Sequence, residues 1–146
     1  MIPVKMVDVS RKRKVYREAT AEGKIYLKPE TIQAIRERRI EKGDVLTVAG
    51  LAALNAVKKT SELLFHCHPL EITWIEPEFR LGDDSITVSV RVKSSGRTGV
   101  EMEALTGVSA ALLAVWDMVK ALEKDEHGQY PFTRISDIRV VKKIKK

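Results

Sequence analysis

The sequence predicts an α+β fold, and two patterns carry this prediction. Residues 85–93 alternate apolar with polar side chains, as expected for a strand that buries one face. A second strand-like stretch over 70–81 precedes it, and Gly82-Asp83-Asp84 joins the two as a hairpin turn. Residues 103–124 repeat apolar side chains every three or four positions, which is typical of a helix with a buried face. We therefore expect an antiparallel or mixed sheet with helices packed on one face.

A short strand and two helices are predicted before the hairpin. Lys24 to Leu27 is a short extended piece, and Pro29 suits the first turn of a helix that runs to Ile40. Lys42-Gly43-Asp44 interrupts that helix. Asp44 is placed to cap a second helix, from Val45 to about Leu64, which is almost uncharged before Lys58.

A long helix and a last strand are predicted after the hairpin. The helix runs from about Glu103 to Lys124, and Ile138 with Val140 marks the strand. The complete order of strands and helices fits the ferredoxin-like plan. We expect a single domain over residues 1–146, because a chain of this length with 44% apolar residues can bury one sizeable core.

Charge and cysteine content limit which kinds of protein the sequence can belong to. The net charge is +6, but eight positive charges lie near the ends, and removing these eight leaves −2. The rest of the chain is therefore not a basic surface for nucleic acid. The single Cys67 excludes an internal disulfide, and we expect neither a membrane span nor a signal peptide. These features predict a cytoplasmic protein. The terminal charges are those of Arg11, Lys12, Arg13, Lys14, Lys142, Lys143, Lys145 and Lys146.

The long helix carries apolar side chains on two sides. Its predicted core-facing stripe consists of Leu105, Val108, Leu112, Val115, Val119 and Leu122. The other side holds Ala110, Leu113, Ala114 and Ala121. A monomer would place charged side chains there, so we expect another copy of the chain to cover this face. The pattern predicts a homo-oligomer.

Four ionisable side chains on this helix are candidate site residues. Asp117 and Lys120 are the only charges within residues 105–121, and their spacing places them on one side. They form either an ordinary exposed ion pair or part of a site, since charges among apolar neighbours are paired, ligated or used. Glu101 and Glu103 converge if the chain is extended there, whereas in a helix they point apart and favour its N-terminal dipole.

His66-Cys67-His68-Pro69 is a further candidate segment, between a helix and a strand. His66 and His68 could ligate a metal, but two histidines without matching carboxylates or thiolates are a weak zinc pattern, so no metal site is predicted. Cys67 is expected to be a packed thiol, because nothing in the sequence supplies a base for it. Lys42-Gly43-Asp44 lacks the glycine spacing of a phosphate-binding loop and is interpreted as a turn with a cap.

Five motifs resemble, in order and approximate spacing, the molybdenum cofactor biosynthesis protein C family. The resemblance extends from Met6 to about Lys124, and its longest motif begins at Gly99. The motifs are Met6-Val7-Asp8-Val9-Ser10, Lys42-Gly43-Asp44-Val45, Cys67-His68-Pro69-Leu70, Gly99-Val100-Glu101-Met102-Glu103-Ala104-Leu105-Thr106 and Asp117-Met118-Val119-Lys120-Ala121.

This resemblance implies cyclic pyranopterin monophosphate synthase activity. The substrate is a cyclised dihydro-GTP, in which ribose C3′ is bonded to purine C8, and the products are cyclic pyranopterin monophosphate and diphosphate. The chemistry needs proton donors and acceptors and no redox cofactor, and Mg²⁺ is expected at most as a companion of the triphosphate. The resemblance also implies ferredoxin-like subunits in a hexamer, a trimer of dimers, with active sites at subunit boundaries.

The resemblance further implies roles for individual residues. Lys42 and Lys120 match the family's general acid/base lysines, and Asp117 matches its catalytic aspartate. A lysine crowded by other cations can have a lowered pKa, and Asp117 can orient Lys120. The basic residues near the phosphates match Arg17 and Lys58. The substrate-contacting segments match His66, Cys67, His68, Glu101, Met102 and Glu103.

Two other functions remain as alternatives. One is a ferredoxin-like nucleic-acid-binding module that uses the basic ends, although such modules present aromatic side chains on exposed strands, and Phe79 is the only Phe or Tyr in the hairpin. The other is a hydrolase with paired carboxylates and a histidine-bound metal. We expect no specific nucleic acid and no membrane as partner.

Overall fold

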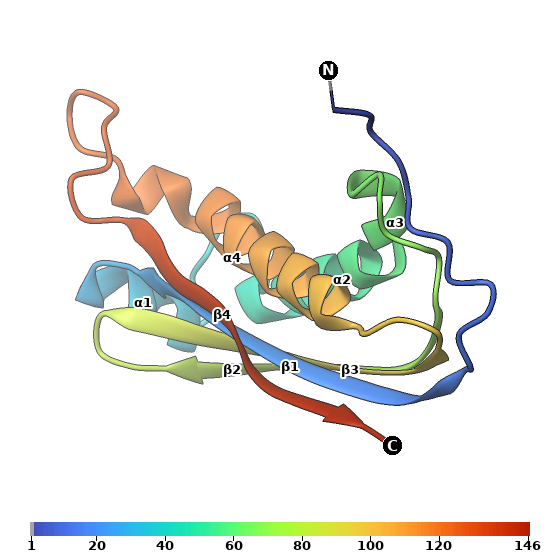
Figure 1. The fold of residues 1–146 in the computed structure, drawn as a ribbon. Helices are drawn as coiled ribbons and strands as arrows, with labels where there is room; N and C mark the ends of the chain where they lie inside the picture. Colours follow the sequence, from blue (N-terminus) through green and yellow to red (C-terminus); the bar gives the residue numbers. More distant parts are fainter. Residues whose placement is uncertain (1) are drawn as a thin grey trace.

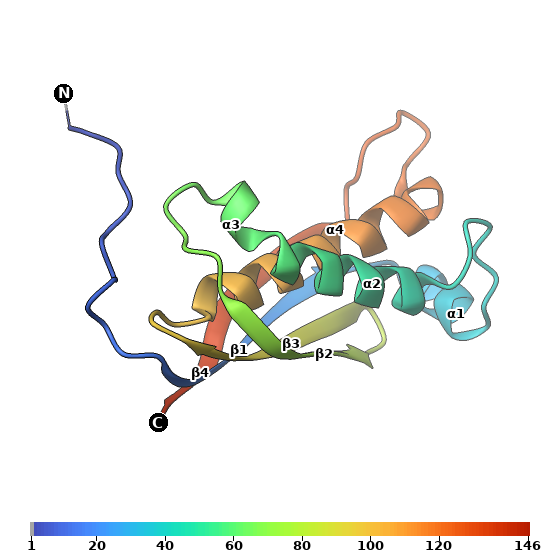
Figure 2. The same ribbon diagram turned by 90° about the vertical axis from the view of Figure 1, so that its right-hand side faces the viewer.

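The computed structural model, which describes residues 2–146, has two layers: a four-stranded sheet and a layer of helices on one face of it (Figures 1 and 2). The strands are β1 (Val15–Tyr26), β2 (Glu71–Leu81), β3 (Ser85–Gly96) and β4 (Arg134–Lys145). The helices are α1 (Pro29–Arg36), α2 (Val45–Lys58), α3 (Thr60–Leu63) and α4 (Glu101–Glu123). This arrangement confirms the predicted α+β class.

The sheet order is β2-β3-β1-β4, and all three neighbouring pairs are antiparallel. Strands β1 and β2 therefore run in the same direction with β3 between them, and β3 and β4 do so with β1 between them. Two split βαβ units of this kind define the ferredoxin-like plan, which is confirmed.

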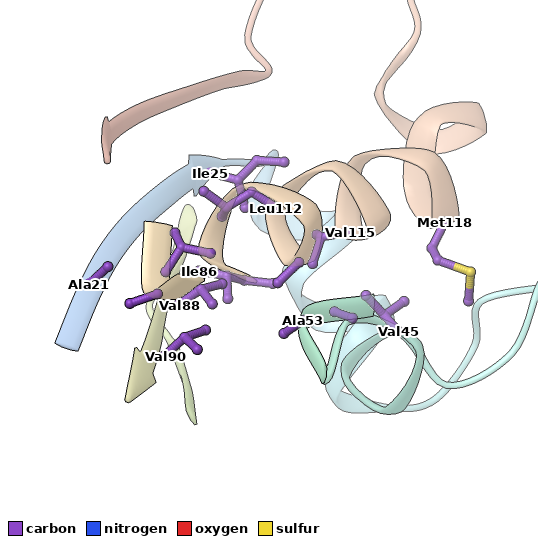
Figure 3. Close-up of a cluster of buried hydrophobic side chains, with 14 of the residues drawn as sticks. Ala21, Ile25, Val45, Ala53, Ile86, Val88, Val90, Leu112, Val115 and Met118 are labelled. Atoms are coloured by element: carbon purple, nitrogen blue, oxygen red, sulfur yellow. The ribbon is translucent and has the colours of Figure 1, made fainter. Parts of the chain in front are cut away.

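The core lies between the sheet and the two long helices (Figure 3). The inward side chains of β3 are wholly buried, from Ile86 to Val92, and they face Leu112 and Val115 of α4. Helices α2 and α4 pack side by side at a point where a Cβ on Gly107 would lie 2.8 Å from Cγ2 of Val57. Small residues thus allow both helices to lie close to each other and to the sheet.

Strand β1 is much longer than the predicted piece from Lys24 to Leu27. Its inward positions include Ala19, Ala21 and Gly23, residues with low strand propensity that the alternation rule does not detect. Their small size has a physical reason, since α4 crosses directly above them. A Cβ on Gly23 would lie 2.8 Å from side-chain atoms of both Val108 and Leu112.

Several other predicted boundaries were wrong. Helix α1 ends at Arg36 rather than Ile40, followed by Arg38 in the left-handed region at a φ of 56°. The helix expected up to Leu64 divides at Lys59 into α2 and α3, and β4 extends well beyond Ile138 and Val140 in both directions. The capping prediction is confirmed, because the Asp44 carboxylate accepts a hydrogen bond from the backbone N–H of Thr47 at 3.4 Å.

Helix α4 buries most of its predicted stripe. Leu122 is an exception, with 47% of its surface exposed, and Leu105 is only partly buried, whereas Ala104 and Ala111 are wholly buried. On the opposite side Leu113 is 62% exposed. By length and composition α4 is apolar enough to cross a membrane, but here it packs along the sheet and against α2 as a core helix.

We expect Gly23→Ala to lower the free energy of unfolding by about 1–3 kcal/mol, because the added methyl group overpacks the contact with α4. Gly50→Ala is the matched control. Its added Cβ would lie 3.8 Å from the Phe79 ring, an ordinary contact, and alanine favours the helix by about 0.5–1 kcal/mol. Urea unfolding of both variants measures the difference, and equal effects of the two substitutions would contradict this account of packing.

Candidate functional site

A pocket of about 300 Å³ opens at the N-terminal end of α4. Three segments form its wall: the N-terminal segment before β1, the loop before β2, and the turn that leads into α4. We call it the α4 pocket. Its lining residues are Val7, Val9, Lys12, His66, Cys67, His68, Leu70, Thr98, Gly99, Met102 and Glu103. The structure therefore brings together five of the predicted substrate-contacting residues.

Glu103 is the buried carboxylate of the α4 pocket, and only 4% of its surface is exposed. It lies in the first turn of α4, where the backbone amides favour a negative charge. Desolvation outweighs this effect and raises the pKa of Glu103 to about 7, with a smaller contribution from the charge of Glu101. The pocket thus contains a carboxyl group that can exchange a proton near neutral pH.

Glu101 faces away from Glu103, so the helical alternative holds and the two carboxylates do not converge. Its Oε1 atom lies 2.6 Å from Nζ of Lys143, which projects from β4. Partial burial by itself would raise the pKa of Glu101. The hydrogen bond from Lys143, together with smaller effects, outweighs burial, so the pKa of Glu101 lies below its ordinary value. Glu101 is therefore an anion that ties α4 to the edge strand β4.

The His66-Cys67-His68 segment lies on the wall of the pocket without forming a metal centre. Nε2 of His68 is 2.7 Å from the backbone carbonyl oxygen of Val7, which joins the loop to the N-terminal segment. Burial, and then the nearby charge of Glu103, raises the pKa of the Cys67 thiol, which agrees with a packed thiol. Across residues 2–146 no three His, Cys, Asp or Glu side chains gather as metal ligands.

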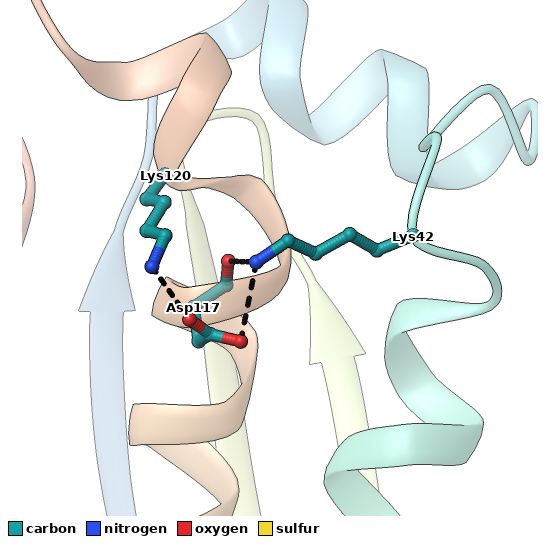
Figure 4. Close-up of polar contacts among 3 residues, drawn as sticks. All are labelled: Lys42, Asp117 and Lys120. Carbon is teal, nitrogen blue, oxygen red and sulfur yellow. Dashed lines mark hydrogen bonds and ion pairs between the residues drawn. The ribbon is translucent and has the colours of Figure 1, made fainter.

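Lys42, Asp117 and Lys120 form a second cluster, the lysine trio (Figure 4). Nζ of Lys42 donates to the backbone oxygen of Asp117 at 2.9 Å and to its Oδ2 at 3.3 Å. Nζ of Lys120 lies 2.9 Å from Oδ1 of the same carboxylate. All three side chains are substantially exposed. A turn containing Gly43 carries Lys42 across to α4, and the φ of 120° at Gly43 is one that favours glycine.

The charges of the trio act on each other in a definite direction. Hydrogen bonds from Lys120 and then Lys42 hold the pKa of Asp117 below its usual range. The same bond from Lys120 to Asp117 raises the pKa of Lys120. The pKa of Lys120 is therefore not lowered by neighbouring cations in the single chain, because the nearest charge to Lys120 is the Asp117 carboxylate.

Within one chain the lysine trio and the α4 pocket lie far apart. Glu103 occupies the first turn of α4, whereas Asp117 and Lys120 occupy its last two turns, which at 1.5 Å per residue places the groups about 20 Å apart. Arg17 and Lys58 lie at the pocket end. Arg17 is buried in β1 and donates to the backbone oxygens of Gly96 and Arg97, at 3.2 Å each, and Lys58 shares a small cavity with Glu103.

Sequence reasoning missed three basic residues at this end of the molecule. Lys12 and Lys143 were grouped with the terminal charges, yet Lys12 lines the α4 pocket and Lys143 pairs with Glu101. Arg97 donates from Nε to the backbone oxygen of Lys12 at 3.1 Å and fixes the N-terminal segment against the pocket. Lys143 pairs with Ala19, an inward position of β1, and this strand register places the Lys143 side chain on the helix side of the sheet. The register cannot be seen in the sequence.

The chain is similar to a well-populated family of proteins. The model of the MoaC family matches residues 6–145, a span that contains every candidate residue above. A protein of Pyrococcus abyssi named a probable cyclic pyranopterin monophosphate synthase is 58% identical over 97% of this chain and 89% of its own length. A protein of Aeropyrum pernix with the same name is 58% identical over 92% of both. A protein of Methanothermobacter thermautotrophicus named a probable accessory protein of that synthase is 59% identical over 97% of this chain and 89% of its own length.

The raised pKa of Glu103 predicts a pH-dependent penalty in stability. The folded chain binds this proton more tightly than the unfolded chain, so the free energy of unfolding falls as the pH rises from 4.5 through about 7. Glu103→Gln removes the titration. Its stability relative to the wild type should therefore rise by about 2 kcal/mol between pH 5 and pH 8 in urea unfolding. A difference independent of pH would show that Glu103 is not protonated in the folded chain at pH 5.

Proposed function

Because the chain belongs to the MoaC family, we propose that it is a cyclic pyranopterin monophosphate synthase. It converts (8S)-3′,8-cyclo-7,8-dihydroguanosine 5′-triphosphate into cyclic pyranopterin monophosphate and diphosphate, a lyase step of molybdenum cofactor biosynthesis. The observation that carries the proposal is the match over almost the whole chain, which includes both the α4 pocket and the lysine trio. The names of the relatives favour this lyase over a nucleic-acid-binding module.

The lysine trio supplies the acid/base groups of the proposed site. Opening the imidazole ring and rebuilding a pterin requires protons to be delivered and removed at ring nitrogens and carbons. Lys120, whose pKa is raised by Asp117, carries its proton at neutral pH. The raised pKa makes it a weaker acid, but a stronger base once that proton has been transferred. Asp117 holds both ammonium groups and orients them. Lys42, which lies in the turn before α2, brings its ammonium group to Asp117 and is the second proposed acid/base lysine.

The α4 pocket holds the substrate in this proposal. His66, Cys67, His68, Met102 and Glu103 line it, and Glu101 lies beside it. Arg17 and Lys58 are the nearby basic residues assigned to the phosphates, since a triphosphate needs several cations. Rearranging a purine to a pterin involves no net oxidation, so the reaction requires no redox cofactor, and Mg²⁺ enters at most with the triphosphate.

A complete site requires two copies of the chain. The pocket and the trio lie about 20 Å apart on α4, too far for one substrate to touch both within a single chain. In a twofold, antiparallel arrangement of two copies, the beginning of one α4 approaches the end of the other. Exposed apolar side chains on the helical layer support such a contact, since soluble monomers rarely expose a large apolar patch. They are Val48, Leu51, Leu63, Phe65, Leu113 and Leu122.

Three such dimers would form the homohexamer that we propose for this enzyme, in the cytoplasm. Light scattering or analytical ultracentrifugation at micromolar concentration tests the assembly. A stable monomer would rule out the two-chain site.

We expect Lys42→Ala and Lys120→Ala each to lower turnover at least a thousandfold, because each removes a proton donor from the reacting site. Supplying the cyclised dihydro-GTP and measuring pyranopterin monophosphate and diphosphate provides the assay. Lys124→Ala, at an exposed lysine just beyond α4, is the control and should retain full activity. Near-normal turnover of either test variant would remove that lysine from the mechanism.

Mixing two inactive variants tests the two-chain site. Lys120→Ala lacks the trio, and Glu103→Ala lacks the pocket carboxylate. If both halves of a site come from different copies, unfolding and refolding the mixture should restore about a quarter of wild-type activity, since half of the dimers are mixed and each has one intact site. A mixture as inactive as its components would mean that each site belongs to one chain.

A further inference from the structure

The most deeply buried carboxylate of the molecule, Glu123, lies outside the proposed site. It is in the last turn of α4 and is 0% exposed. Its Oε2 accepts hydrogen bonds from the backbone N–H of Lys28 at 3.1 Å and from Oγ1 of Thr31 at 2.5 Å. Its Oε1 accepts from Oγ1 of Thr133 at 2.7 Å and, more weakly, from the N–H of Lys28 at 3.3 Å. One carboxylate therefore joins α4 to the start of α1 and to the segment before β4.

This network is a reciprocal cap between two helices. Helix α1 has no side chain of its own that caps its N-terminus, and Glu123 supplies the missing acceptor and the negative charge. In return, Nζ of Lys28 donates to the backbone oxygen of Leu122, in the last turn of α4, at 3.2 Å. Each helix end thus receives the charge that its dipole favours.

The segment that begins with α1, residues 28–44, contacts α4 a second time, through Lys42. Residues 28–44 begin at the contacts with Glu123 and end near the bond from Lys42 to Asp117. These two anchor points lie about 9 Å apart along α4. Between them are the short helix α1 and a turn closed by the N–H of Gly43 donating to the oxygen of Ile40 at 3.1 Å.

We propose that Glu123 is a positioning residue for Lys42. By fixing the start of residues 28–44 on α4, its carboxylate sets where the turn carries the Lys42 ammonium group. The Lys42 side chain is exposed, and among residues 2–146 Asp117 is its one polar partner. Glu123 itself has no access to solvent and takes no part in the chemistry. This inference rests on the proposed function, because it concerns the acid/base lysine of that site.

Two threonines that donate to Glu123 offer a matched pair of variants. Thr31→Val removes a hydroxyl that belongs to the Lys42 segment, and Thr133→Val removes one that does not. Both hydroxyls are buried, so both variants should lose stability. If Glu123 positions Lys42, Thr31→Val should lower kcat at least fivefold more than Thr133→Val, with KM little changed. Equal losses of kcat would overturn the inference.

Hydrogen exchange of the backbone amides of residues 38–44 separates this inference from the proposed function. Glu123→Gln, which keeps the shape and one acceptor, should increase exchange moderately, and Glu123→Ala should increase it strongly. Unchanged exchange in Glu123→Ala would overturn the positioning role even if the enzyme is active. Conversely, a wild-type chain that fails to convert the cyclised dihydro-GTP would overturn the proposed function, while the exchange data would still decide whether Glu123 holds this segment.

Discussion

The close contact of α4 with the sheet and with α2 is the constraint on which the rest of the structure depends. Space at this contact is so restricted that Gly23 and Gly107 have no room for a side chain. Because the middle of α4 is fixed in this way, its two ends are fixed as well, and each end carries ionisable groups. The α4 pocket forms where the helix begins, and the lysine trio forms where it approaches its end. The geometry of the proposed site thus follows from the packing of one helix.

The ionisable groups at the two ends of α4 differ in how far they are exposed to solvent. At the beginning of α4, burial outweighs the favourable helix dipole and leaves Glu103 with a pKa of about 7. The pKa of Glu101 stays below its ordinary value, because Lys143 donates a hydrogen bond to its carboxylate. At the other end the charges are exposed, and Asp117 holds two ammonium groups at hydrogen-bonding distance. One end of α4 thus carries a buried acid and the other an exposed pair of lysines around a carboxylate. In the proposed two-chain site these two ends face each other across the apolar outer side of the helices.

The sequence alone was sufficient to predict those strands and helices whose side chains follow one clear pattern of burial. The alternation in β3 and the periodicity of α4 reflect burial on one face, and both elements were predicted almost to their ends. Most of β1 was missed, because Ala19, Ala21 and Gly23 were selected for small size beneath α4, a requirement that arises only in the assembled fold. Similarly, Lys12 and Lys143 belong to basic runs, and only the path of the N-terminal segment and the register of β4 place them at the pocket end. Local patterns therefore reveal burial, whereas close contacts and long-range ion pairs require the tertiary structure.

In the proposed site, the charge of the substrate also affects which groups can give up or accept a proton. A triphosphate brings negative charge, which favours the protonated form of any nearby lysine. In the proposed site, substrate binding would therefore keep these lysines protonated, which makes them weaker acids and unavailable as proton acceptors. A proton acceptor must then come from elsewhere. Glu103, whose pKa of about 7 leaves it divided between acid and carboxylate near neutral pH, has the property that proton exchange requires. In the proposed mechanism, donor and acceptor meet at one substrate only when they come from two copies of the chain, because Glu103 and Lys120 lie at opposite ends of α4.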